Sequence, residues 1–158
     1  MTTNEVALAA KRPYAYMPIV AGGTAFMYNL QINGQRFTNL RLSPDAVAKI
    51  FTGVIKQWND PAIAADNPGV PLPAIPVKPV IRSDGSGTSA QFTAYMASEA
   101  SGVWSSFCQR VGLGGGCRPT SLYPEFDGST AQQFSDGVAD RKSTRLNSSH
   151  GYISYAVF

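Results

Sequence analysis

Residues 82–89 are the part of the chain whose residue types could do chemistry, in the order Arg-Ser-Asp-Gly-Ser-Gly-Thr-Ser. Arg82 offers a planar fork of N–H donors that matches an oxyanion, and the hydroxyls of Ser86 and Thr88 add donors that can rotate to fit. The two glycines tolerate positive φ, so successive backbone N–H groups can converge on one point at a helix start. The octet therefore indicates a site for phosphate or a related anion.

The same composition has a plainer interpretation, because Gly, Ser, Asp and Thr are common loop residues and a Ser or Thr before a helix is usually its N-cap. Several known motifs are excluded. The chain has no Gly-Lys-Ser/Thr here, and the glycine spacing fits neither the dinucleotide-binding pattern nor the nucleophile elbow. On these residues alone, an anion site and an ordinary capped loop both remain open.

The elements that must position the octet follow from apolar runs and helix signals. An apolar run at 77–81 predicts a strand that delivers Arg82, and residues 90–97 predict a helix behind the octet. We expect its buried face to carry Phe92, Tyr95 and Met96. Further upstream, residues 3–10 predict a short helix, 14–20 and 24–30 predict strands covered on both faces, and 32–34 predict a turn.

Other helices are predicted from their caps and apolar stripes. Ser43 followed by Pro44 and Asp45 predicts a helix start, and Asp60 before Pro61 repeats the device. The apolar stripe of the first of these helices is Val47, Ile50, Phe51 and Val54. Two more helices are expected, one around Trp104, Phe107 and Val111, and a last one over 130–138 with Phe134 facing inward.

Length and composition describe one ordinary globular domain. The chain has 158 residues, of which 44% are hydrophobic and 15% charged, with a net charge of +3. Residues 11–30 resemble a signal peptide only superficially, because Pro and Gly interrupt the apolar run, so we expect no signal peptide here. No stretch is long and apolar enough to predict a membrane-spanning helix.

The last nineteen residues read as a foreign tail. Residues 140–150 are what the genetic code gives for a common short-read sequencing adapter, and residues 153–158 continue the same adapter after a short index. We therefore expect the natural protein to occupy residues 1–139 and residues 140–158 to be a translated artefact. This segment holds three of the 13 basic and one of the 10 acidic residues, so without it the net charge falls from +3 to +1.

That small charge removes the case for a nucleic-acid partner. The only histidine, His150, belongs to the tail as well. Without it the body has no Ser-His-Asp or Cys-His arrangement and no imidazole for a metal. We therefore expect no catalytic residues, no metal and no cofactor.

The two cysteines, Cys108 and Cys117, bracket a glycine-rich run at 112–116. Their spacing fits neither a Cys-x-x-Cys metal site nor a redox dithiol, which leaves a disulfide in an oxidising compartment as one interpretation. Two reduced thiols are the other.

Four segments together resemble the PstS-type phosphate-binding protein of bacterial phosphate ABC transporters. They are Tyr-Met-Pro-Ile-Val-Ala-Gly-Gly from Tyr16, Leu-Ser-Pro-Asp from Leu42, the run from Ile50 that ends in Trp-Asn-Asp-Pro at Pro61, and the octet from Arg82. The resemblance covers roughly residues 5–139 in order.

The resemblance implies an α/β fold: an incomplete lobe of the type II periplasmic-binding-protein class, with a mixed sheet flanked by helices. It also implies a non-enzymatic, periplasmic or cell-surface protein that binds inorganic phosphate and delivers it to a membrane permease. By that resemblance Arg82 pairs with phosphate, Asp84 orients Arg82, and Ser86, Gly87 and Thr88 supply backbone N–H groups and hydroxyls.

The chain departs from the family pattern at both ends. The first-lobe phosphate contacts, including the aspartate that separates phosphate from sulfate, have no counterpart here, and neither has the C-terminal return to the first lobe. We therefore expect half a site and weak binding. The alternatives are a serine phosphatase or hydrolase that uses Ser86, and a scaffold module that reuses the lobe.

Overall fold

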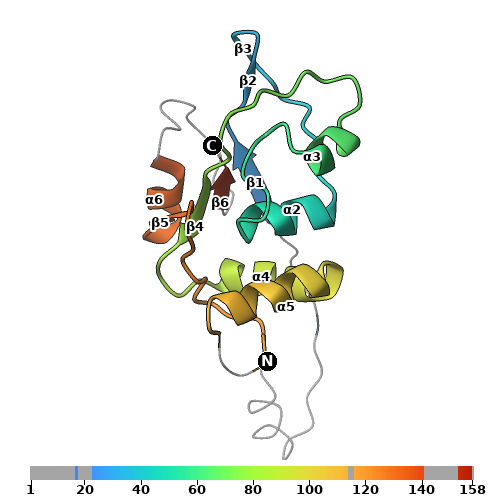
Figure 1. Ribbon diagram of the computed structural model, residues 1–158. Coiled ribbons are helices and arrows are strands. Elements are labelled where there is room, and N and C mark those ends of the chain that lie inside the picture. The colour runs from blue at the N-terminus through green and yellow to red at the C-terminus, as the bar shows by residue number, and fades with distance from the viewer. Residues whose placement is uncertain (1–16, 18–22, 114–115, 141–152, 158) are drawn as a thin grey trace, which may run out of the picture.

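The computed structural model describes residue 17 and residues 23–113, 116–140 and 153–157. The expected helix at 3–10 lies outside these residues, as does nearly all of the expected strand at 14–20. The described part is a mixed sheet with helices packed around it, which confirms the α/β prediction (Figure 1).

The central sheet has four strands in the order β1-β6-β4-β5. Their bounds are Ala25–Tyr28 for β1, Ile153–Val157 for β6, Pro79–Arg82 for β4 and Thr130–Gln132 for β5. The β1/β6 and β4/β5 pairs are parallel, whereas β6 runs antiparallel to β4. The sheet is therefore mixed, and the C-terminal segment occupies a position inside it.

A two-stranded hairpin follows β1, with β2 at Gln31–Ile32 and β3 at Gln35–Arg36. Its two turn residues, Asn33 and Gly34, have φ of 53° and 77°. Positive φ at both positions is the geometry that an Asn-Gly pair favours in a tight hairpin. The turn predicted at 32–34 is confirmed.

Two short helices begin at the predicted caps. Helix α2 spans Pro44–Phe51, and its first turn is capped by Ser43, whose Oγ accepts the Ala46 N–H at 3.3 Å. Helix α3 spans Pro61–Asp66, and Asp60 caps it by accepting the Ala62 N–H at 2.9 Å. Both starts follow the same local rule, a side-chain acceptor followed by proline at the first helical position.

Three further helices complete the fold: α4 at Gly87–Glu99, α5 at Ser101–Arg110 and α6 at Phe134–Asp140. Helices α4 and α5 lie side by side and pack against α2 (Figure 1). Helix α6 packs against β6, β4 and β5 (Figure 1).

Aromatic side chains dominate the core between α2, α4 and α5. The ring centroids of Phe51 and Phe92 are 5.1 Å apart in an edge-to-face arrangement, and Phe26 lies 5.1 Å from Phe92. The Tyr123 hydroxyl donates to the Phe51 carbonyl oxygen at 2.6 Å, so its polar end is satisfied within the core. This packing fixes α4, the helix behind the octet.

A loop also ties down the first turns of α4. The Thr93 hydroxyl donates to the Thr120 carbonyl oxygen at 3.0 Å and accepts the Thr120 N–H at 2.9 Å. One residue further along the loop, the Ser121 carbonyl oxygen accepts the Ser86 N–H at 2.9 Å.

The structure corrects two burial predictions. Val54 is 53% exposed, because α2 ends at Phe51 and the chain turns at Gly53, whose φ is 70°. Tyr95 is 38% exposed, whereas Phe92 and Met96 on the same helix are buried as predicted.

The single helix predicted over 130–138 is also wrong. Its first residues form β5, because they pair with the buried strand β4, and α6 begins only at Phe134. Phe134 is 63% exposed instead of facing inward, and Val138 is the residue of α6 that is fully buried.

In the part of the chain that the structure describes, the helices are all too short or too polar to span a bilayer. The same residues contain no group of three or more side chains arranged as potential metal ligands.

Candidate anion-binding site

The octet forms a strand, turn and helix unit. All four residues of β4 are buried, and Arg82 is the last of them. The chain then turns through residues 83–85, and α4 begins at Gly87 with Ser86 as its N-cap. The Ser86 Oγ accepts the Ser89 N–H at 3.4 Å, which leaves the O–H of Ser86 able to donate to a ligand. The local fold thus places a buried arginine at a helix N-terminus.

Arg82 and Asp84 form a two-point ion pair within the turn. The Arg82 Nε donates to Asp84 Oδ1 at 2.7 Å, and Nη2 pairs with Oδ2. The side chain of Arg82 is 9% exposed and that of Asp84 is 20% exposed. This pairing fixes the plane of the guanidinium, which is what the orienting role expected of Asp84 requires.

The surroundings of Asp84 stabilise its ionised carboxylate. The hydrogen bonds from Arg82 hold the pKa of Asp84 well below its usual value, and the Phe134 N–H, which donates to Oδ1 at 2.8 Å, acts in the same direction. Burial acts in the opposite direction and is outweighed. The ion pair therefore persists across the neutral pH range.

A third residue contacts the guanidinium. The Ser135 Oγ lies 3.3 Å from Arg82 Nη1 and accepts a hydrogen bond from it. Ser135 comes from α6, more than fifty residues further along the chain than Arg82. Sequence reasoning missed it because one continuous helix was predicted over 130–138. Of Thr130–Gln132 only Thr130 has a clear strand preference, so the local sequence carries no signal that would have placed Ser135 at a helix start.

The three backbone N–H groups expected to face an anion are not equivalent. The Ser86 N–H already donates to the Ser121 carbonyl oxygen, which leaves the hydroxyl of Ser86 as its remaining donor. The N–H groups of Gly87 and Thr88 have no hydrogen-bond acceptor among the described residues, as is usual in the first turn of a helix. These two amides, together with the positive end of the α4 dipole, can attract an anion.

The two cysteines are free thiols in the structure. Burial raises the pKa of Cys108 to about 12, and a hydrogen bond with Cys117 contributes to the rise. The Cys117 Sγ donates to the Ser105 carbonyl oxygen at 3.7 Å, one turn before Cys108 on α5. A disulfide between Cys108 and Cys117 remains a prediction.

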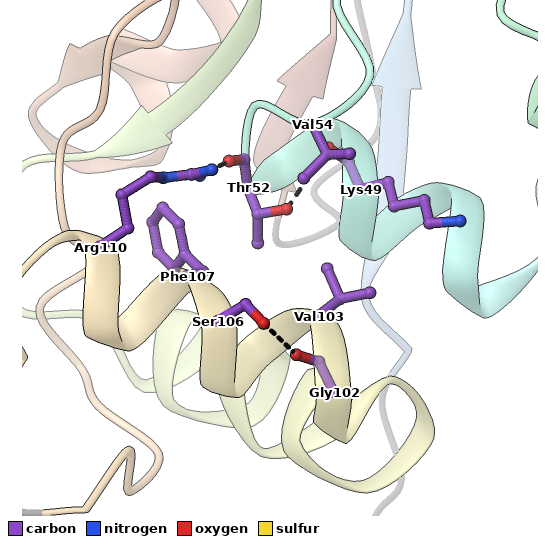
Figure 2. Close-up of a pocket in the computed structure, with 8 residues that line it drawn as sticks. All are labelled: Lys49, Thr52, Val54, Gly102, Val103, Ser106, Phe107 and Arg110. Atoms are coloured by element: carbon purple, nitrogen blue, oxygen red, sulfur yellow. Dashed lines mark hydrogen bonds between the residues drawn. The ribbon is translucent and has the colours of Figure 1, made fainter.

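A cavity of about 290 Å³ lies between α2 and α5, away from the octet (Figure 2). Val54, Val103 and Phe107 give it apolar walls, and both of its cations are engaged. Arg110 donates to the Thr52 carbonyl oxygen and lies 5.4 Å above the Phe107 ring centroid, while Lys49 pairs with Asp45 at 2.6 Å. No residue of the octet lines this cavity.

The fold and the site define the class of protein. The family model described as a PBP superfamily domain matches residues 1–156, and the chain belongs to this superfamily.

Within it, the chain is similar to proteins named phosphate-binding protein PstS. It is 46% identical over 88 residues to PstS 3 of Mycobacterium leprae, an alignment that covers 56% of this chain and 23% of that protein. It is 39% identical over 106 residues to PstS2 of Mycobacterium bovis, with 65% of this chain and 28% of the relative covered. A match to PstS of Pasteurella multocida has 37% identity over 150 residues and covers 94% of this chain and 39% of the relative. The chain spans well under half the length of these relatives.

Proposed function

We propose that this chain is part of the substrate-binding component of a phosphate ABC transporter and that the octet holds inorganic phosphate. The observation that carries the proposal is Arg82, a buried arginine held at two points by Asp84 at the N-terminus of α4. The names of the relatives support phosphate as the anion.

In this proposal each member of the site has a defined task. Phosphate accepts hydrogen bonds from the Nη groups of Arg82, from the N–H groups of Gly87 and Thr88, and from the hydroxyls of Ser86 and Thr88. Asp84 holds the arginine fork and offsets its charge, so the ligand is held chiefly by directed hydrogen bonds. A membrane permease is the proposed partner, and the periplasm or the cell surface the proposed location.

The geometry does not favour the hydrolase alternative. The Ser86 hydroxyl accepts the Ser89 N–H, and no histidine lies among the described residues to act as its base. The site is arranged for binding, with donors and one fixed cation.

Calorimetric titration of the complete protein, recovered from the source genome, tests the proposal. We expect phosphate binding in the wild type and a loss of roughly 1.5–3 kcal/mol in Arg82→Ala, because a charge-assisted hydrogen bond is removed. Wild-type affinity in that variant would reject the assigned site. The 158-residue chain should bind more weakly than the complete protein, because it holds only part of the expected ligand set.

A further inference from the structure

The start of α6 contacts both members of the Arg82–Asp84 ion pair. Ser135 accepts a hydrogen bond from Arg82 Nη1 at 3.3 Å, and the Phe134 N–H donates to Asp84 Oδ1 at 2.8 Å. Adjacent residues of one helix therefore bind the cation and the anion of the same pair.

The sheet explains how α6 reaches the site. Strands β4 and β5 are parallel neighbours, with Arg82 opposite Gln132, and the Ser83 N–H donates to the Gln132 carbonyl oxygen at 3.0 Å. Parallel neighbours end at the same edge of a sheet. Ser135 comes three residues after Gln132, at the edge where Arg82 leaves β4.

Ser135 adds a constraint that Asp84 does not provide. The carboxylate holds the Nε and Nη2 side of the guanidinium, whereas Ser135 holds Nη1 at the far end. Nη1 and Nη2 together form the edge that offers two parallel donors to an oxyanion. A hydroxyl beside Nη1 therefore sets the direction of one of the donors that a bound anion would use.

We propose that Ser135 is a positioning residue of the site: its hydroxyl fixes the Nη1 end of Arg82 so that the guanidinium is aligned for phosphate. This inference rests on the proposed function for its ligand, and on the Arg82–Ser135 contact for its geometry. It assigns α6 a role in binding that the octet alone does not contain.

Side-chain NMR of the ¹⁵N-labelled 158-residue chain tests the inference. The variants are Ser135→Ala, which removes the hydroxyl, and Ser135→Thr, which retains it. Ser106→Ala is the matched control, because Ser106 is an exposed serine on α5 whose hydroxyl donates only to its own helix, at the Gly102 carbonyl oxygen 2.9 Å away. The Arg82 Nε–H and Nη signals are followed without ligand and during titration with millimolar inorganic phosphate.

We expect Ser135→Ala to increase exchange of the Arg82 Nη protons and to weaken phosphate binding by about three- to tenfold, the range for the loss of one ordinary hydrogen bond, because Ser135 acts on the anion only through Arg82. Ser135→Thr should restore both properties, and Ser106→Ala should leave both unchanged. Unchanged Arg82 signals in Ser135→Ala would overturn the inference even if no phosphate binds.

The two proposals fail in different ways. If phosphate shifts the wild-type signals and Arg82→Ala abolishes the response while Ser135→Ala does not alter it, the positioning role is wrong and the phosphate site stands. If Ser135→Ala loosens the Arg82 signals but phosphate shifts nothing in the complete protein, the positioning contact stands and the ligand is wrong.

Discussion

The Asp84 carboxylate accepts hydrogen bonds from Nε and Nη2 of the Arg82 guanidinium, with Nε 2.7 Å from Oδ1. Only Ser83 separates the two residues in the chain. So close a pair can form wherever the turn after β4 forms, and it does not depend on a distant element. The more distant contacts of the site, from Ser121 and Ser135, are added to this local arrangement.

Protonation of Asp84 should lower the free energy of unfolding at acidic pH. Because its pKa is lowered on folding, its contribution is fully present above the ordinary aspartate value of about 4 and is lost as the pH falls through the lower folded-state value. Urea unfolding at a series of pH values should show this loss in the wild type, with a smaller loss in Asp84→Asn. Identical pH profiles would show that the ion pair does not contribute to folding.

Arg82→Lys should behave much like Arg82→Ala in phosphate titrations of the complete protein. Lysine keeps the positive charge but cannot hold Asp84 at two points while offering two donors to the ligand. We expect it to lose most of the roughly 1.5–3 kcal/mol assigned to Arg82. Affinity close to the wild type would mean that charge alone, without the fork, holds the anion.

Gly53→Ala should destabilise the fold more than Gly69→Ala. Both glycines have positive φ, at 70° and 78°, so each substitution should cost about 1 kcal/mol of backbone strain. At Gly53 the new methyl group would also lie 2.8 Å from the Phe126 ring, whereas nothing lies within 4 Å at Gly69. We expect a further cost of about 1–3 kcal/mol at Gly53, measured by urea unfolding. Equal losses would show that the Phe126 ring moves aside freely.

Cys108 and Cys117 should form a disulfide under oxidising conditions. Cys117 Sγ lies 3.7 Å from the Ser105 carbonyl oxygen, one turn before Cys108 on the same helix, and closing the short loop between the cysteines should stabilise the fold by about 2–3 kcal/mol. Thiol titration and unfolding, each with and without reductant, measure both effects, and Cys117→Ser is the control that cannot form the bond. Two titratable thiols in the unfolded, oxidised chain would contradict the prediction.

A chain that ends at Ala139 should have two unpaired strand edges. Strand β6 is the shared neighbour of β1 and β4, so its removal leaves backbone groups of both without partners. Light scattering over a range of concentrations should show association of residues 1–139 and not of the 158-residue chain. If the chain of residues 1–139 is monomeric and as stable as the 158-residue chain, β6 does not stabilise the sheet.

We also propose that residues 140–158 are a translated adapter, so the natural protein should supply a different segment to this position in the sheet. Sequencing the source locus from untrimmed genomic DNA decides this. Recovery of the same codons in the chromosome would reject the adapter origin and make β6 a native strand.

The sequence predicted those parts of the molecule that depend on neighbouring residues. The caps at Ser43 and Asp60, and the Asn-Gly turn, are determined within a few positions, and all are present in the structure. The octet likewise contains its own ion pair.

The predictions that were wrong concern residues whose structure depends on partners distant in the sequence. Residues 130–132 become a strand because β4 lies beside them, and the last helix therefore starts later and turns Phe134 outward. For the same reason, Ser135 was not predicted to contact Arg82.

The loop that carries Ser121 has a consequence for how such a site can diverge. The Ser86 N–H donates to the Ser121 carbonyl oxygen, and the Thr93 hydroxyl forms two hydrogen bonds with the Thr120 backbone. The loop therefore helps to set the orientation of the first backbone N–H groups of α4. Under the proposed function, a substitution in this loop could change the lifetime of the bound anion without altering any residue of the octet.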